Sequence, residues 1–412
     1  MALPILTEQP ENKLDLAGKK ILLGLTGGIA CYKSAEFARA LIRDAGATVQ
    51  VVMTESATQF ITPLTMQTLT GLPVYVSQWG RPAVSEIAHI DLRREADAIV
   101  IAPCTANFIG KLANGIADDL LSSICLARRI STPFMVAPAM NVEMWQNPAT
   151  QRNIAQLRAD GIGILGPASG FQACGDIGMG RMLEPQELLQ ETIAAFQPRS
   201  LAGKRVLITA GPTFEPIDPV RGLTNRSSGK MGYAVARAAR EAGAEVVLVS
   251  GPSALDVPYG VVCHHVVSAS QMYEAVMSLV QGQDIFIAVA AVADWRVKNV
   301  GAQKIKKDES GSLSLEFEAN PDILEAVARL ENPPFCVGFA AESENLVAHG
   351  TEKRKKKNIP LLVGNIGHET FGLDENELTL FDEKGHQSLP RAQKQTLARQ
   401  LVLEIAKRTS QP

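Results

Sequence analysis

One opening pattern occurs twice in this sequence and constrains the fold more than any other feature. Residues 16–23 read LAGKKILL, and residues 201–208 read LAGKRVLI. Both runs lead into a turn that contains glycine and then into a helical stretch. A buried parallel strand reads as continuous apolar residues, so each run predicts the first strand of an open α/β sheet. The repeat is short, and we interpret it as two similar beginnings.

Strands and helices alternate after each opening, which predicts two doubly wound, mostly parallel sheets. The 412 residues suit two domains. We expect an N-terminal extension (1–16), a first domain (17–195) and a second domain (196–412). Strands are expected at 20–25, 49–53, 98–102, 133–137 and 162–165, and then at 205–209, 245–249, 261–266, 284–290, 335–339 and 360–363. Helices are expected at 33–44, 185–196 and 391–408, and a hairpin near 378–381 and after Gly385.

The composition excludes several classes of protein. A net charge of −3 argues against a general nucleic-acid surface, which needs a large basic excess. The six cysteines form no C-x-x-C pair, so reduced thiols in the cytosol are expected rather than disulfides. No secretory leader opens the chain, and no apolar run approaches the ~20 residues of a membrane span. We therefore expect a cytoplasmic protein that acts on small molecules, without a nucleic-acid or membrane partner.

Sheets of this kind bind ligands beyond the carboxyl ends of their strands. Residues 24–30, GLTGGIA, follow the first predicted strand, and their glycines would let a phosphate approach the backbone at a helix N-terminus. The spacing is not G-x-G-x-x-G, which weighs against a dinucleotide. Residues 102–107, APCTAN, bring a hydroxyl and an amide to another strand end. A tight strand–helix turn and a helix cap explain the two segments as well.

Three residues of the first domain are candidates for chemistry. His89 lies between apolar residues, where a packed core histidine is the commoner explanation. Asn141 follows a strand end and could simply cap a turn. Cys174 lies in the glycine-dense segment 170–180, which we expect to be a mobile loop. Core packing explains a loop cysteine poorly, so we favour a functional role for Cys174.

Together these motifs resemble the flavin-containing cysteine decarboxylases, and most closely the phosphopantothenoylcysteine decarboxylases. The similarity covers residues 17–190 and rests on TGGIA, PCTAN, PAMN, the histidine ahead of an acidic residue, and ACGDIGMGRM. It implies a flavodoxin-like or Rossmann-like domain with FMN held by Gly27, Gly28, Thr54, Thr105, Asn107, Ser122 and Ser123. It also implies that His89 is the base of an oxidation step, that Asn141 holds the substrate carboxylate and that Cys174 donates a proton. In this family the site lies between subunits of a trimer.

The second domain has its own candidate site. The segment SSGK at 227–230 precedes a helical stretch, which indicates a helix N-terminus that presents N–H groups and a lysine to an anion. The P-loop pattern is absent, and an ordinary capped helix is the alternative. The strand 285–295, IFIAVAAVADW, ends in small residues that would admit a flat base, with Asp294 as a nucleotide ligand. The lysine-rich segments 304–307 and 353–357 favour a triphosphate, whereas a solvated helix face is the usual explanation of a charge run.

These motifs resemble the phosphopantothenate–cysteine ligases across residues 203–365. The resemblance implies a Rossmann-like domain that binds CTP through Ala288, Val289, Ala290, Asp294, Lys304, Pro321, Asp322, Ile323, Leu324, Phe339, Lys353 and Lys357. Lys304 would stabilise charge at the α-phosphate, and Asn225 would orient an acyl-cytidylate. No protein metal ligands are assigned, because Mg²⁺ is expected to arrive with CTP. Dimer contacts are implied for this half.

Together the two resemblances predict a bifunctional enzyme of coenzyme A biosynthesis. It would ligate 4′-phosphopantothenate with cysteine and then decarboxylate the product to 4′-phosphopantetheine. Two alternatives come from other classes of protein. An NAD-dependent dehydrogenase fits the sheets but lacks the dinucleotide fingerprint. A non-catalytic flavoprotein subunit would be expected to have lost His89, Asn141 and Cys174, and all three are present.

Overall fold

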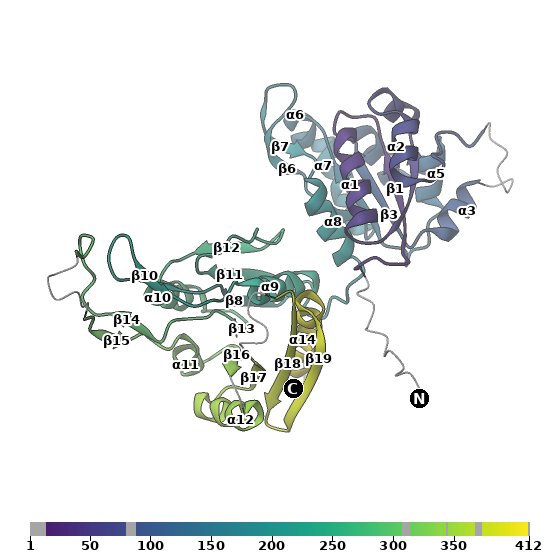
Figure 1. Cartoon of the computed structure of the whole chain (residues 1–412). Coiled ribbons are helices and arrows are strands. Elements are labelled where there is room, and N and C mark those ends of the chain that lie inside the picture. Colours follow the sequence, from purple (N-terminus) through teal and green to yellow (C-terminus); the bar gives the residue numbers. More distant parts are fainter. Residues whose placement is uncertain (1–13, 80–87, 307–313, 343–344, 367–372, 411–412) are drawn as a thin grey trace, which may run out of the picture. The chain divides into compact units, whose positions relative to one another are not determined.

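The chain forms two compact units, Met1–Phe196 and Gln197–Pro412 (Figure 1). The computed structural model describes residues 14–79, 88–306, 314–342, 345–366 and 373–410. In this part of the chain no helix is long and apolar enough to cross a membrane. Each unit is described separately below.

The first unit is built on a parallel sheet of five strands. In space the order is β2-β1-β3-β4-β5, which is the flavodoxin-like order. The strands are β1 (Lys20–Leu25), β2 (Thr48–Met53), β3 (Ala98–Cys104), β4 (Phe134–Pro138) and β5 (Gly163–Ile164). Every residue of β3 and β4 is buried, which accounts for their continuous apolar sequence. The strand order reverses between β1 and β3, so their carboxyl ends flank a ready-made crevice.

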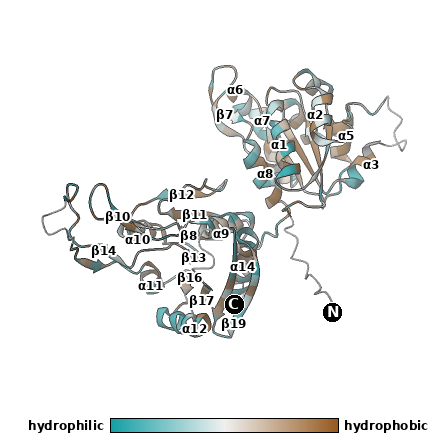
Figure 2. Ribbon diagram, in the orientation of Figure 1, coloured by the Kyte–Doolittle hydropathy of each residue, from teal (hydrophilic) through white to brown (hydrophobic). Residues whose placement is uncertain are grey.

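Helices cover both faces of this sheet. They are α1 (Cys31–Arg43), α2 (Pro63–Thr70), α3 (Ala88–Glu95), α4 (Ala106–Ala113), α5 (Leu120–Leu126), α6 (Val142–Gln146), α7 (Pro148–Ala159) and α8 (Pro185–Ala194), with a short 3₁₀ helix, η1 (Glu55–Gln59). One core cluster joins α4, α5 and α7 to the sheet, and α1 packs against α8. Figure 2 shows hydrophobic residues concentrated on the strands and hydrophilic residues on the outer sides of α1 and α8.

The glycine-dense segment that we expected to be a mobile loop forms a β-hairpin instead. Its antiparallel strands are β6 (Ala168–Phe171) and β7 (Ile177–Arg181), with Phe171 opposite Ile177. Single-sequence patterns miss it because its strands are short and rich in glycine, a residue that normally weakens strands.

The second unit contains a sheet of eight strands. Its order is β12-β11-β8-β13-β16-β17-β18-β19, and the first six are parallel in the 3-2-1-4-5-6 order of a Rossmann fold. The strands are β8 (Arg205–Ala210), β11 (Glu245–Ser250), β12 (Val262–His265), β13 (Ile285–Ala288), β16 (Phe335–Glu342), β17 (Leu361–Ile366), β18 (Glu375–Asp382) and β19 (Gly385–Gln393). The last two are antiparallel and form the predicted hairpin. The predicted fold class is confirmed for both units.

Two helices bury one face of this second sheet and three lie against the other. The first pair is α9 (Lys230–Glu241) and α14 (Lys394–Thr409). The other face carries α10 (Ala269–Leu279), α11 (Ile323–Ala328) and α12 (Leu346–Lys357). Two antiparallel ribbons were not predicted, namely β9 (Phe214–Pro216) with β10 (Gly222–Thr224) and β14 (Trp295–Val297) with β15 (Phe317–Ala319).

A buried carboxylate fastens α9 to α14. The Glu241 side chain is 3% exposed and accepts hydrogen bonds from Arg237 at 2.9 Å and from Arg399 at 2.6 and 3.1 Å. Arg237 is one turn away on α9, whereas Arg399 belongs to α14 and is 158 residues further along the chain. A carboxylate that is buried between two guanidinium groups is satisfied only when both helices are in place.

We expect Glu241→Gln to lower the free energy of unfolding of the second unit by about 3 kcal/mol, because it leaves the arginines without their carboxylate. Urea unfolding would measure the loss. Hydrogen exchange should become faster in α9 and α14 and stay unchanged in α1. Glu245→Gln, at an exposed position on β11, is the control and should change stability by less than about 0.5 kcal/mol. Unfolding of Glu241→Gln that matches the wild type would contradict this account.

Candidate functional site

A cavity of about 920 Å³ lies at the carboxyl ends of β1, β2, β3 and β4 in the first unit. Residues that follow each of these strands line it, together with residues of the β6–β7 hairpin. Among them are Thr26, Gly27, Gly28, Ile29, Ala30, Thr54, Ser56, Thr105, Asn107, Phe108, Met140, Asn141, Met144, Cys174, Arg181 and Met182. The cavity therefore occupies the point at which the strand order reverses.

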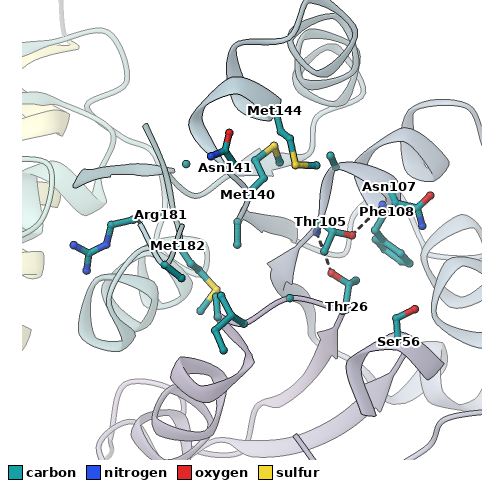
Figure 3. Close-up of a pocket in the computed structure, with 18 of the residues that line it drawn as sticks. Thr26, Ser56, Thr105, Asn107, Phe108, Met140, Asn141, Met144, Arg181 and Met182 are labelled. Atoms are coloured by element: carbon teal, nitrogen blue, oxygen red, sulfur yellow. Dashed lines mark hydrogen bonds between the residues drawn. The ribbon is translucent and has the colours of Figure 1, made fainter. Parts of the chain in front are cut away.

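Thr26 ties the two central strands together beneath this cavity. Its buried hydroxyl donates to the carbonyl of Pro103 at 2.8 Å and accepts from the Thr105 N–H at 3.0 Å (Figure 3). Thr105 in turn caps α4 by accepting from the Phe108 N–H at 3.3 Å. The two threonines thus fix the strand ends, and Figure 3 shows the Asn107 side chain beside them at the start of α4.

The donor set of the cavity suits a phosphate at one end and a flat ring at the other. The turn ahead of α1 supplies Gly27, Gly28, Ile29 and Ala30 to the cavity, and the positive end of the helix dipole favours an anion there. The N–H groups of Cys31, Tyr32 and Lys33 themselves donate to the carbonyls of Gly28, Ile29 and Ala30. Ile29, Phe108, Met140 and Met144 line the same space with apolar surface. An anion site beside apolar walls fits a mononucleotide that carries an aromatic ring system.

Asn141 and Cys174 meet on the wall of the cavity. The Asn141 amide Nδ2 lies 3.2 Å from the Cys174 Sγ, although the residues are 33 positions apart. Asn141 caps α6 by accepting from the Glu143 N–H at 2.8 Å, so a helix start fixes its orientation. Cys174 is exposed, whereas Cys31, Cys104, Cys125 and Cys336 are buried and Cys263 is intermediate. Burial raises the pKa of the Cys336 thiol to about 12.

Close backbone contact holds the hairpin against the Asn141 turn. The Met140 N–H donates to the Gly180 carbonyl at 3.0 Å. Gly180 has φ +141°, and a Cβ at this position would lie 2.3 Å from the Met140 carbonyl oxygen. Only glycine fits there, so the glycines of this segment dock the hairpin instead of loosening it.

The remaining predicted residues of the first unit are placed as follows. Gly27, Gly28, Thr54, Thr105 and Asn107 line the cavity. Ser122 and Ser123 are not among the described lining residues. The Ser122 hydroxyl instead completes the capping box of Asp119 at the start of α5, and the Ser123 hydroxyl donates to Ala117. His89 belongs to α3, and its side chain lies outside the described part of the structure.

Sequence reasoning missed several residues that line this cavity. Lys33 and Arg181 are examples, and both pair with Glu184, at 2.7 Å and 2.9 Å. The buried Lys33 ammonium also donates to the Met182 carbonyl at 3.0 Å, which joins α1 to the end of β7. Arg181 was already within the quoted GMGRM segment, whereas no pattern singled out Lys33 or Gln172.

A second cavity, of about 500 Å³, lies at the carboxyl ends of β8 and β13 in the second unit. It contains all the predicted nucleotide-binding residues except Lys304, and also Asn225. The additional lining residues are Thr209, Ser227, Ser228, Lys230, Met231, Ala291, Val292, Ala293, Asn320, Ala340, Ala341, Asn365, Asn376 and Lys394. The predicted strand 284–290 ends early, at Ala288, and the small residues that follow form one wall of the cavity.

Side-chain hydrogen bonds fix this small-residue segment. The Thr209 hydroxyl accepts from the Ala290 N–H at 3.3 Å, and the Thr213 hydroxyl accepts from the Ala293 N–H at 3.0 Å. The Asn225 amide donates to the Ala291 carbonyl at 2.9 Å. A flat group that bound against these alanines would meet a rigid backbone.

Cations gather on two sides of the second cavity. Lys357 pairs with Asp322 and Glu325, and burial lowers the pKa of its ammonium although Asp294 opposes this shift. Burial also lowers the pKa of Lys394, and the neighbouring Lys230 adds to the effect. Lys230 pairs with Asp374 at 2.6 Å, and the same carboxylate opposes the shift at Lys394. Sequence reasoning missed Lys394 because it reaches the cavity from the far end of the chain.

Lys304 is exposed and does not line the second cavity among the described residues. Its neighbour Ile305 is fastened to the β9–β10 turn by Asp218 and Arg221. The Asp218 side chain is 0% exposed, and its carboxylate accepts from the Ile305 N–H at 3.2 Å and from the Arg221 guanidinium at 2.6 and 3.0 Å. Arg221 also donates to the Ile305 carbonyl at 2.9 Å. In the described residues no group of three or more His, Cys, Asp or Glu could hold a metal ion.

Two family models match the chain, one for each unit. The Flavoprotein model matches residues 9–197, and the model of the DNA/pantothenate metabolism flavoprotein C-terminal domain matches residues 201–409. The Coenzyme A biosynthesis bifunctional protein CoaBC of Vibrio cholerae is 50% identical over 389 residues, which cover 93% of this chain and 97% of that protein. The protein of the same name from Escherichia coli is 46% identical over 402 residues, or 96% and 98%.

Solved structures resemble each unit. The C-terminal domain of a CoaBC protein is 40% identical and covers 51% of this chain and 97% of its own, with a TM-score of 0.44. The FMN binding protein AtHal3 is 36% identical and covers 43% of this chain and 96% of its own, with a TM-score of 0.38.

The fold and the two sites define a two-domain enzyme with a flavoprotein domain followed by a pantothenate-metabolism domain. The chain belongs to the family of coenzyme A biosynthesis bifunctional proteins, CoaBC, whose members match it over nearly their whole length. The predicted bifunctional activity, phosphopantothenoylcysteine decarboxylase and phosphopantothenate–cysteine ligase, is thereby confirmed.

We expect Gly180→Ala to detach the hairpin from the Asn141 turn, because its Cβ would overlap the Met140 carbonyl oxygen. The free energy of unfolding of the first unit should fall by about 2 kcal/mol. Proteolysis within the hairpin should become faster. Gly161→Ala is the matched control, because Gly161 has φ +75° but a Cβ there would meet no atom within 4 Å. Equal effects of the two changes would show that the close contact is unimportant.

The Asp218 carboxylate should make the second unit sensitive to acid. The Arg221 guanidinium holds the pKa of Asp218 well below the ordinary carboxyl value of about 3.9. A pKa that folding lowers stabilises the folded state above the unfolded pKa, and this stabilisation is lost as the pH falls through the folded pKa. The difference in urea midpoint between wild type and Asp218→Asn should therefore be larger at about pH 7 than at about pH 3. For Asp256→Asn, at an exposed position, the difference should stay the same at both pH values.

Proposed function

We propose that the first unit decarboxylates 4′-phosphopantothenoylcysteine with FMN in its cavity, and that the second unit makes this substrate from 4′-phosphopantothenate, cysteine and CTP. The observation that carries the proposal is the contact between Asn141 and Cys174 on the wall of a cavity at the strand-order reversal. An amide that can hold a carboxylate and a thiol that can donate a proton are thus within reach of one bound substrate.

In the first cavity, Gly27, Gly28 and the rest of the turn ahead of α1 would hold the FMN phosphate, with Thr54, Thr105 and Asn107 around it. When bound, FMN would supply reversible two-electron redox chemistry at the cysteine end of the substrate. Asn141 would hold the substrate carboxylate until it leaves, and His89 would accept a proton during the oxidation. Cys174 would donate a proton to the enethiol that remains. Ser122 would act here through the Asp119 capping box that it completes at the start of α5.

In the second cavity, Ala288, Val289, Ala290, Phe339 and residues 321–324 would surround the cytosine and ribose of CTP. Asp294, Lys353 and Lys357 would complete the nucleotide contacts. The carboxylate of 4′-phosphopantothenate would attack the α-phosphate, with release of pyrophosphate, to form an acyl-cytidylate. The amine of cysteine would then attack the acyl carbon and displace CMP. Mg²⁺ would be carried by the triphosphate, because it keeps several waters and needs few protein ligands.

Two residues would assist this ligation from the β9–β10 side. Asn225 would orient the acyl-cytidylate, because it lies in the cavity wall and is fixed on the Ala291 carbonyl. Lys304 would stabilise charge at the α-phosphate, for which its segment has to turn toward the nucleotide. We further propose a cytoplasmic homo-oligomer, with trimer contacts through the first unit and dimer contacts through the second.

A coupled assay on the purified chain tests the proposal. With 4′-phosphopantothenate, cysteine and Mg²⁺, addition of CTP should yield pyrophosphate and CO₂, and ATP should yield less of both. Pyrophosphate without CO₂ would contradict the proposed role of the first cavity. The absence of both products would contradict the proposed roles of both cavities.

We expect two substitutions to separate the activities. Cys174→Ala should lower formation of 4′-phosphopantetheine by at least about a hundredfold and leave pyrophosphate release unchanged, because only the proton donor is lost. Lys304→Gln should lower pyrophosphate release by a similar factor and spare decarboxylation of supplied 4′-phosphopantothenoylcysteine. If either change abolished both activities, the assignment of one reaction to each unit would be wrong.

A further inference from the structure

The side chain of Asp176 lies against Asn141 and Cys174, and it has no role in either reaction as described above. The Asp176 carboxylate Oδ2 accepts from the Asn141 amide at 2.6 Å and lies 3.2 Å from the Cys174 Sγ, which donates to it. Asn141 and Cys174 line the cavity, whereas Asp176 is not among its described lining residues. One carboxylate therefore contacts both groups from outside the substrate space.

The backbone of the hairpin turn fixes this arrangement. The Gln172 N–H donates to the Asp176 carbonyl at 2.8 Å, and the Gly175 N–H donates to the Gln172 carbonyl at 2.9 Å. Gly175 has φ +95°, which turns the chain tightly enough to set the side chains of Cys174 and Asp176 beside each other. The buried Gln172 side chain accepts from the Val142 N–H at 3.0 Å and so ties the turn to the start of α6.

Both ends of the Asn141 amide have assigned partners. Its Oδ1 accepts from the Glu143 N–H at 2.8 Å, and its Nδ2 donates to Asp176. This leaves the second N–H of Nδ2 for the Cys174 sulfur or for a substrate carboxylate. Asp176 thus selects the orientation in which the amide donates toward the cavity.

A carboxylate beside a thiol also controls the position of the thiol proton. An ionised carboxylate only accepts hydrogen bonds, so the Cys174 S–H is directed toward it. Decarboxylation leaves an enethiol, which must take up a hydride, supplied by the reduced cofactor, and a proton. Cys174 gives the proton, becomes a thiolate and is reprotonated by water.

We propose that Asp176 is a positioning residue for this reduction step, which holds the Cys174 S–H and turns the Asn141 amide toward the substrate. The inference rests on the proposed role of Cys174 as the proton donor. Asp176 would act through its two neighbours and would have no contact with the reacting atoms.

The test compares Asp176→Asn with Asp176→Glu and with the control Glu143→Gln, which removes a nearby exposed carboxylate from the first turn of α6. The first measurement is the rate at which iodoacetamide alkylates Cys174, followed by mass spectrometry of the Cys174 peptide. Asp176→Asn should be alkylated about tenfold faster than the wild type, because the carboxylate that accepts the Cys174 S–H is gone and an amide can donate to the sulfur. Asp176→Glu should restore the slow rate in part, and Glu143→Gln should match the wild type.

The second measurement is a single turnover with 4′-phosphopantothenoylcysteine. In Asp176→Asn, release of CO₂ should stay within about twofold of the wild type, and formation of 4′-phosphopantetheine should slow about tenfold. Alkylation and reduction rates equal to those of Glu143→Gln would overturn the proposal. Failure of the proposed function would give a different result, because Cys174→Ala would then still form 4′-phosphopantetheine at the wild-type rate. The alkylation rates would still report whether Asp176 positions the thiol.

Discussion

In each unit, a buried threonine at the carboxyl end of the first strand links this strand to the neighbouring strand end beside the candidate site. Thr26 bridges β1 to the end of β3, and Thr209 bridges β8 to the segment that follows β13. Both hydroxyls span the place where the strand order reverses, so both lie where neighbouring strand connections diverge. Because the hydroxyl is buried in each case, the strand ends cannot separate without leaving a polar group unpaired.

The two units use the same position in a sheet for different chemistry. The first cavity combines a glycine-containing turn at the start of α1 with methionine and phenylalanine side chains, which suits a phosphate joined to a large flat ring. The second combines small residues with several lysines, which suits a base and a highly charged phosphate chain. Partial burial lowers the pKa values of Lys357 and Lys394, so an incoming anion would favour their charged forms.

The sequence was sufficient to predict the parallel strands, because burial on both faces makes them continuous apolar runs. It was also sufficient to predict which loop residues line the cavities, because the topology brings the carboxyl ends of the parallel strands to one edge of each sheet. The hairpin that carries Cys174 could not be predicted in this way. Its strands are stable only when Gly180 and Gln172 contact the turn at 140–142, and such a distant contact has no local pattern. Lys304 shows the opposite case, because a strong local motif lies in a segment that Asp218 holds outside the cavity.

The Arg399–Glu241 contact joins α14 to α9, and it bears on the order in which the second unit is completed during synthesis. Lys230 and Lys394 are the first residues of these two helices, and both line the second cavity, so two helix N-termini face the same space. Along the chain, α14 comes after every other described residue that lines this cavity, so ribosomal synthesis adds it after them. The second cavity of a nascent chain is therefore incomplete until α14 emerges, whereas the described residues that line the first cavity extend only to Met182.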